Sequence, residues 1–300
     1  MSDEHLGHLR HLARSLRVEP GTRVRLPHGF DPGHTGGYVR EADAAGALAA
    51  GVRLLSSYQA RLAAQDSYGL LVVLQALDAA GKDGAVQHVM SGVNPQGVWV
   101  RSFKVPSADE LNHDFLWRYT RDLPPRGMIG IYNRSHYEEV LVVRVHPENL
   151  ERQHLPESAR GKDVWGRRLR AINDWERHLV ENGIHVVKIF LNLSPEEQRR
   201  RLLARIDDPD KNWKFSAADL AERGHWDDYQ RAYSDVLTHT STEAAPWNVV
   251  PADHKWFARV AVAAVIVDAL AAIDPRFPEL GPDEHAALKR ARAQLIAMKE

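Results

Sequence analysis

The stretch Leu70–Gly84, LLVVLQALDAAGKDG, contains the order of elements that decides the fold class. Its first part, Leu70–Leu74, is a short continuous apolar run, which is typical of a strand buried on both faces of a parallel sheet. The loop Ala76–Gly84 follows, and residues 84–91 have a helical pattern. A strand, a glycine-containing loop and a helix in this order predict an α/β fold with a phosphate-binding loop, or P-loop.

The loop is close to the Walker A pattern G-x-x-x-x-G-K-[ST], in which backbone N–H groups at a helix N-terminus bind phosphate and the lysine supplies a mobile cation. Gly81 and Lys82 match it, whereas Ala76 replaces the first glycine and Asp83 replaces the Ser/Thr that holds Mg²⁺. Asp78 lies inside the loop, where a carboxylate repels phosphate unless a cation stands between them, so we interpret it as a magnesium ligand or a base. The alternative is a glycine-rich turn with a solvated lysine.

Strands and helices alternate along the rest of the chain, which predicts a parallel α/β sheet covered by helices on both faces. Further strands are expected at 98–103, 128–132, 185–193 and 248–251. Helices are expected at 40–64, 108–121, 137–145, 167–181, 195–206, 228–238, 256–273 and 283–298. We therefore expect a single domain over 1–300, with an irregular N-terminal extension at 1–40, a lid at about 196–226 and a C-terminal helical tail at 276–300.

The overall charge excludes a binding mode based on the whole surface. The chain has 300 residues, 39 of them basic and 40 acidic, so nothing in the net charge of −1 favours nucleic acid or a membrane surface as a partner. It contains no cysteine, which removes thiolate sites and disulfides. The N-terminus lacks the apolar core of a secretory signal, and the longest apolar run, 260–272, contains Asp268 and is too short to span a bilayer. We expect a cytoplasmic enzyme.

The third predicted strand ends in a group of polar residues. Asn133 stands where a Walker B motif has an acid, and Glu138 could supply the missing negative charge. Arg134 would face the same phosphate region. The alternative is a polar turn from strand to helix, with Ser135 as the N-cap. From sequence, His136 also stays open as a phosphate-accepting nucleophile.

A basic segment follows the fourth predicted strand. Arg201 and Arg205 share one helix face by i,i+4 spacing, and Lys211 and Lys214 follow in DPDKNWKFS. An arginine-bearing segment at this place is similar to the lid of small nucleotide kinases, which screens developing charge and excludes water. The alternative is a solvated helix face that pairs with the acidic residues at 196–197.

Together, seven segments of the chain resemble the polyphosphate kinase 2 family. They are ALDAAGKDG, GVNPQGVWVRSFKVPS, HDFLWR, YNRSHYEEVLVVRVHP, INDWERHL, DDPDKNWKFS and STEAAPWNVVPADHKWFARV. The resemblance covers nearly the whole chain. It implies a thymidylate-kinase-like fold with five parallel strands and a helical lid. It also implies Mg²⁺-dependent transfer of the terminal phosphate between inorganic polyphosphate and AMP or ADP, with ATP as the product from ADP. Mn²⁺ is an alternative ion, GMP and GDP are further acceptors to consider, and the family leads us to expect a homodimer or homotetramer.

The resemblance also implies roles for individual residues. The catalytic set is Asp78, Lys82, Asp83, Asn133, Arg134 and Glu138. The polyphosphate-binding set is Gly81, Lys82, Gly84, Arg134, Arg144, Arg201, Arg205, Lys211 and Lys214. Lys104 and Arg118 are the candidates for the acceptor nucleotide, and Asp78 and Glu138 for the metal. Many family members have Asp in place of Asn133 and Asn in place of Glu138, and the Asn/Glu combination is similar to the subgroup that accepts both AMP and ADP.

Two other functions compete with this one. An ATP-dependent kinase of a small metabolite is disfavoured by Asp83, because a standard ATP–magnesium site has Ser or Thr there. A non-catalytic scaffold that binds polyphosphate or nucleotides is disfavoured because Asp78, Lys82 and Arg134 are all present. Since phosphoryl transfer needs positioning and charge neutralisation more than covalent chemistry, we expect direct transfer without a phosphorylated enzyme.

Overall fold

The apolar run at residues 70–74 forms part of β1, the central strand of a five-stranded parallel sheet. The computed structural model describes residues 3–298, without the side chains of Asp3 and Lys214. The strand order is β2–β3–β1–β4–β5, and every neighbouring pair is parallel. The strands are β1 (Gly69–Ala76), β2 (Val98–Ser102), β3 (Ile129–Asn133), β4 (Ile184–Asn192) and β5 (Trp247–Pro251).

Helices connect these strands and flank them at both ends of the chain. The α-helices are α1 (Asp3–Ser15), α2 (Glu41–Gln65), α3 (Lys82–Val89), α4 (Ala108–Leu111), α5 (Trp117–Arg121), α6 (Val142–Val145), α7 (Glu148–Glu151), α8 (Val164–Glu181), α9 (Pro195–Asp207), α10 (Ala217–Arg223), α11 (Trp226–Thr240), α12 (Lys255–Ile273) and α13 (Pro282–Ala297). Short 3₁₀ turns are η1 (Pro95–Gly97), η2 (His136–Glu139), η3 (Glu157–Ala159) and η4 (Asn212–Lys214).

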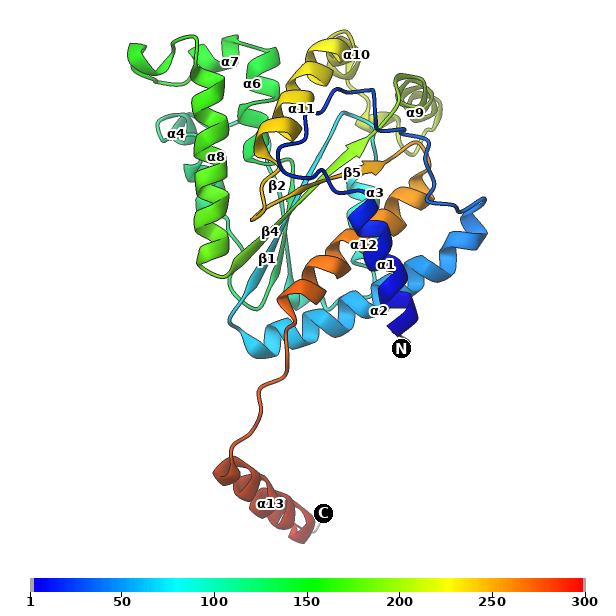
Figure 1. Ribbon diagram of the computed structural model, residues 1–300, viewed down its shortest axis with the longest axis vertical. Helices are drawn as coiled ribbons and strands as arrows, with labels where there is room; N and C mark the ends of the chain where they lie inside the picture. Colours follow the sequence, from blue (N-terminus) through cyan, green and yellow to red (C-terminus); the bar gives the residue numbers. More distant parts are fainter. Residues whose placement is uncertain (1–2, 299–300) are drawn as a thin grey trace.

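Both faces of the sheet are covered, as the continuous apolar sequence of β1 requires. Leu70, Val72 and Leu74 belong to one apolar core, and Leu71 and Val73 to a second core on the opposite face. The first core is closed by α1, α2, α3 and α12, and the second by α8 and α11 (Figure 1). The sheet therefore fixes the carboxyl ends of its strands at one edge, where ligands bind in parallel α/β folds.

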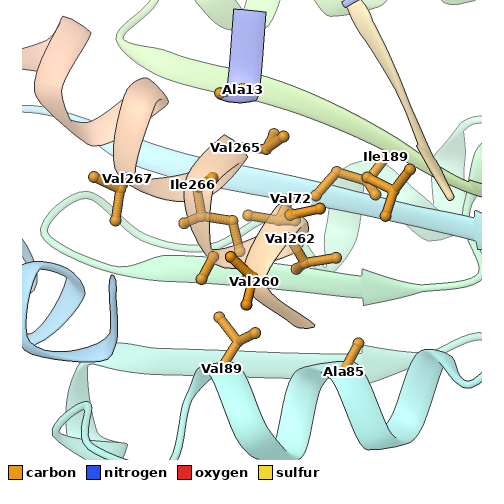
Figure 2. Packing of buried hydrophobic residues seen from close by; sticks show 14 of the residues in the cluster. Ala13, Val72, Ala85, Val89, Ile189, Val260, Val262, Val265, Ile266 and Val267 are labelled. Carbon is orange, nitrogen blue, oxygen red and sulfur yellow. The ribbon is translucent and has the colours of Figure 1, made fainter. Parts of the chain in front are cut away.

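Helix α12 is the main covering element of the first face. Figure 2 shows Val260, Val262 and Ile266 of this helix beside Val72 of the sheet, and Val265 on the side toward Ala13 of α1. At 19 residues it is long and apolar enough to cross a membrane, whereas the apolar run considered from the sequence, 260–272, is shorter. However, 72% of its apolar window is buried inside the protein. Such burial is what a helix in contact with α2, α1 and the sheet requires.

Three of the predicted segments differ from the structure. The expectation of an irregular segment at 1–40 is wrong for residues 3–15, because the apolar residues at positions 6, 9, 12, 13 and 16 form one helical stripe, which packs on α12 and the rest of the first core. The turn signals begin only at Pro20.

The helix expected at 108–121 is split into α4 and α5, because the Asp114 carboxylate accepts the N–H of Leu116 in a local turn. The helix expected at 137–145 is split in the same way into η2 and α6.

The C-terminal tail forms α13, as expected, but this helix lies away from the rest of the molecule (Figure 1). None of its described residues is buried.

Asp268 ties the N-terminal segment to α12. Its carboxylate accepts from the Arg10 guanidinium at 2.9 Å and from Arg17 at 3.4 Å. We expect Asp268→Asn to lower the free energy of unfolding by about 1–3 kcal/mol, because two charge-assisted hydrogen bonds are weakened. Urea denaturation measures this change, and limited proteolysis should cut residues 3–30 faster. Arg14→Ala, at an exposed position of α1, is the control, and a stability of Asp268→Asn equal to that of the control would contradict the role.

Candidate active site

The phosphate loop turns sharply between β1 and α3. Gly81, the N-cap of α3, has φ of +102°, and Ala79 has φ of +63°, so the chain uses the left-handed region twice within three residues. Lys82 folds back, and its Nζ donates to the carbonyl oxygen of Ala76 at 2.9 Å. Burial, together with Arg134, lowers the pKa of Lys82, while the nearby carboxylates oppose this shift. The loop is thus not a turn with a solvated lysine.

Arg201 binds the backbone of the phosphate loop and does not face a ligand site. Its guanidinium donates to the carbonyl oxygens of Ala79 and Ala80 at 3.1 and 2.8 Å, and to those of Ala252 and Asp253 at 2.5 and 3.0 Å. The side chain is buried. The expectation that Arg201 lines a polyphosphate path is therefore wrong, because its donors are already bound to backbone oxygens.

Arg134 brings two predicted site carboxylates together. Its guanidinium lies 3.1 Å from Asp78 Oδ1 and 3.5 Å from Glu138 Oε2. Glu138 raises the pKa of Arg134, burial lowers it, and Asp78 raises it further. The residue has φ of +63°, so the loop after β3 holds this arginine in a strained conformation. A separate hydrogen bond of 2.6 Å joins Asn133 Nδ2 to Asp83 Oδ1.

A buried polar network fixes the residues that follow Arg134. Ser135 Oγ accepts from the Tyr137 N–H, which confirms the predicted N-cap, and from Gln75 of β1. His136 lies 3.1 Å from a Glu176 oxygen, to which the Tyr137 hydroxyl also donates. His136 is completely buried and lines neither of the two cavities at the site, so it is not placed to act as a nucleophile.

Lys188 of β4 completes this network. Its Nζ donates to Glu176 at 2.5 Å, to the Tyr137 hydroxyl at 2.9 Å and to the Thr240 carbonyl oxygen at 2.5 Å. Burial raises the pKa of Glu176, but Lys188 and His136 more than offset this, so the net pKa lies below its ordinary value. The network therefore contains the buried ion pair Lys188–Glu176, and hydrogen bonds from residues 136 and 137 attach the loop 134–139 to it.

Two cavities meet at Arg134 and Glu138. A small cavity of about 40 Å³ is lined by the phosphate-loop residues 76–78 and by both of these side chains. A larger cavity of about 460 Å³ has the same two side chains in its wall, together with Lys104 and Arg118. A volume of this size suits a small ligand. The predicted nucleotide residues are therefore brought to the predicted catalytic residues, although Arg118 is buried and donates to the Lys104 carbonyl oxygen at 3.1 Å.

The lid supplies site residues that the sequence reasoning missed. Gln198 donates to the Asp78 carbonyl oxygen at 3.1 Å and accepts from Arg223 at 2.8 Å, and both side chains line the small cavity. Glu222, which lines the same cavity, accepts from the Tyr229 hydroxyl at 2.7 Å. Arg223 lies inside the predicted lid, but no spacing rule separates it from the other lid cations.

The remaining predicted cations lie apart from the two cavities. Arg144 pairs with Asp235 at 2.6 Å, and Arg205 pairs with Asp219 of α10 at 3.0 Å. Lys211 is exposed and pairs with Asp208, and the side chain of Lys214 lies outside the described ones. Arg200 is exposed and pairs with Glu197 at 2.6 Å, so the alternative of a solvated, paired helix face describes Arg200; Arg201 pairs with the same carboxylate but is buried.

The donor set suits a divalent metal. The Asp78 and Glu138 carboxylates line the same small cavity, and both also pair with the Arg134 guanidinium. Mg²⁺ is held in phosphate-transfer enzymes by one or two carboxylates together with substrate oxygens. The residues present therefore fit Mg²⁺.

Comparison with known proteins gives consistent relatives. The model of the family described as Polyphosphate kinase 2 matches residues 39–278. An ADP-polyphosphate phosphotransferase of Rhodopseudomonas palustris is 53% identical over 82% of this chain and 85% of its own length. An AMP/ADP-polyphosphate phosphotransferase of Meiothermus ruber is 43% identical over 89% of this chain and 96% of its own. The crystal structure of a polyphosphate kinase 2 from Arthrobacter aurescens superposes with a TM-score of 0.83 at 43% identity, covering 93% of this chain and 96% of the other.

The buried pair Lys188–Glu176 gives a stability prediction. Lys188→Met leaves the Glu176 carboxylate buried without its cation, so we expect the free energy of unfolding to fall by about 3–5 kcal/mol. Chemical denaturation measures it. The double variant Lys188→Met/Glu176→Gln removes both charges and should recover part of the loss. A single variant within about 1 kcal/mol of the wild type would contradict the pairing.

Burial also gives a pH prediction, because it lowers the pKa of His136, partly opposed by Glu176. In the unfolded state the imidazole has its ordinary pKa of about 6.5, so below that pH it is protonated while the folded imidazole stays neutral. Stability should therefore fall as pH drops from 7.5 towards 5.5, with a slope for this group approaching about 1.4 kcal/mol per pH unit. His136→Gln should show a shallower fall in the same denaturation series. Equal slopes for both proteins would mean that the pKa of His136 is the same in the folded and unfolded states, which would contradict the prediction.

Proposed function

The chain belongs to the polyphosphate kinase 2 family, and on that premise we propose that it moves the terminal phosphate of inorganic polyphosphate onto AMP and ADP. The family assignment makes it a polyphosphate–nucleotide phosphotransferase. The proposal adds the acceptors, the metal and direct transfer within a basic site. The observation that carries it is the shared wall of the two cavities, formed by Arg134 and Glu138.

The donor phosphate belongs on the phosphate-loop side of this wall. Arg134 and Arg223 line the small cavity there, and Lys82, at the N-terminus of α3, lies behind the lining but close enough to interact electrostatically with Arg134, Asp78 and Glu138. Asp78 and Glu138 would hold Mg²⁺, or Mn²⁺ in its place, which when bound neutralises part of the negative charge on the phosphates. Arg134 then stabilises the phosphoryl group as it passes from one cavity to the other.

The acceptor nucleotide belongs in the larger cavity. Lys104 and Arg118 lie on its wall; Arg118 is buried and pairs with Glu110 at 3.3 Å, so of these two it is the exposed Lys104 whose positive charge suits the phosphates of AMP or ADP. The acceptors named for the Rhodopseudomonas palustris and Meiothermus ruber proteins support ADP and AMP, and a GDP-polyphosphate phosphotransferase of Pseudomonas aeruginosa, 34% identical over 64% of this chain, keeps GMP and GDP as further candidates. The homodimer or homotetramer and the cytoplasmic location stay predictions.

An activity assay tests the proposal directly. Polyphosphate, Mg²⁺ and either AMP or ADP are incubated with the protein, and the formation of ADP and ATP is followed. We expect Asp78→Asn and Lys82→Ala to lower the rate at least about 100-fold, because each removes charge that positions the reacting phosphates. Lys162→Ala, at an exposed lysine outside both cavities, is the matched control.

Thermal denaturation of the same variants separates loss of function from loss of fold. The melting temperatures of Asp78→Asn and Lys82→Ala should stay close to that of the control. Absence of product from both acceptors with folded wild-type protein would overturn the proposed function. Near-wild-type rates for both variants would show that the site is elsewhere.

A further inference from the structure

The segment 17–30 crosses α11 as an extended strap (Figure 1, dark blue across yellow). The backbone N–H groups of Val24 and Leu26 donate to side-chain oxygens of α11 at 2.9 Å each. Val24 and Leu26 are buried, whereas Arg23 and Arg25 are exposed. Successive side chains of an extended chain point to opposite sides, so the two arginines project from the same outer side of the strap.

A basic groove of about 770 Å³ lies along this strap and α11. We call it the strap groove, and its charged lining residues are Arg23, Arg25, Arg144, Arg231 and Asp235. Four arginines thus face one carboxylate, and His28 and His239 add two titratable groups.

Two of the four arginines carry positive charge that no carboxylate balances. Arg144 pairs with Asp235 at 2.6 Å, and Arg231 pairs with Asp228, which lies outside the lining. Within residues 3–298, Arg23 and Arg25 form no ion pair with a carboxylate. The protein as a whole has a net charge of −1, so this local excess is a feature of the groove and not of the composition.

The strap groove adjoins the transfer site across one helix. Tyr229 and Tyr233 of α11 line the small cavity, whereas Arg231 and Asp235, two residues further along in each case, line the groove. Helix α6 links the two regions in the same way, since Leu141 and Val142 at its start line the small cavity and Arg144 lines the groove. The groove and the small cavity therefore lie on opposite faces of α11, and a ligand that occupies both has to pass around this helix.

The lining selects the chemistry of that ligand. The described lining residues include no Phe, Tyr or Trp, and their rings are limited to the imidazoles of His28 and His239, so the groove offers few platforms for stacked bases and single-stranded nucleic acid is disfavoured. The two arginines without a carboxylate partner, Arg23 and Arg25, suit a flexible chain of phosphates, whose binding is driven by counterion release. We propose that the strap groove binds the distal part of a long polyphosphate chain whose terminal phosphate occupies the transfer site. This inference rests on the proposed function and deepens it.

The experiment compares chain lengths. Arg23→Gln/Arg25→Gln is assayed with a long polyphosphate and with a chain of a few phosphates, at saturating AMP. We expect the KM for the long chain to rise about tenfold and its dependence on salt to become shallower, because two phosphate contacts are lost. The KM for the short chain, the KM for AMP and kcat should stay at wild-type values. Arg53→Gln/Arg177→Gln, which removes two exposed charges outside the groove, is the matched control.

Direct binding of labelled long-chain polyphosphate, without nucleotide, keeps the inference testable if the wild type forms no product. In that case the proposed function fails, and a weaker affinity of the strap variant than of the control still supports a polyanion groove. Equal KM values and affinities for the strap variant and the control would overturn the inference. A change in sedimentation of the strap variant would overturn it too, because the groove would then be an interface between copies of the chain.

Discussion

The contacts of Arg201 constrain the whole site. One guanidinium binds carbonyl oxygens from the loop after β1 and from the loop after β5, and it projects from the helix that follows β4. Because the C=O and N–H of a trans peptide point in opposite directions, the bond to the Ala80 carbonyl turns the N–H of Gly81 away from Arg201. A phosphate loop needs its N–H groups facing outward in this way. A residue of the lid helix thus determines the shape of the loop that the sequence identified first.

A second buried charge performs the equivalent task for the loop after β3. The Glu176 carboxylate forms hydrogen bonds with His136, Tyr137 and Lys188, and these contacts hold the strained backbone of Arg134 in place. A buried pair of this kind contributes little net stability, but the loss of one partner is costly. It therefore acts as a constraint on geometry. Arg201 anchors the loop that carries Asp78, and the Glu176 network anchors the loop that carries Arg134; the two side chains then meet at 3.1 Å.

The fold was largely predictable because its signals are local. The apolar run of β1, the loop 76–84 and the alternation of elements are each carried by neighbouring residues, and the ends of all five strands were predicted within two residues. The convergence of Asp78, Arg134 and Glu138 also followed, because parallel strands end at one edge of the sheet. The role of Arg201 could not be predicted from the sequence. Its i,i+4 spacing with Arg205 describes the helix surface, whereas its role depends on carbonyl groups more than 50 residues away on either side in the sequence. Helix α1 was missed for a different reason: glycine and proline after residue 19 outweighed the apolar stripe before it.

The common wall between the two cavities has a consequence for the order of events. In the proposed function the donor and the acceptor occupy separate cavities, so a ternary complex would form and no side chain would need to become phosphorylated between two binding steps. The same Arg134 and Glu138 face both compartments. In the proposed reaction the phosphoryl group that leaves one cavity would be stabilised by the same two residues that receive it in the other, so the arrangement would serve the reverse reaction as well as the forward one.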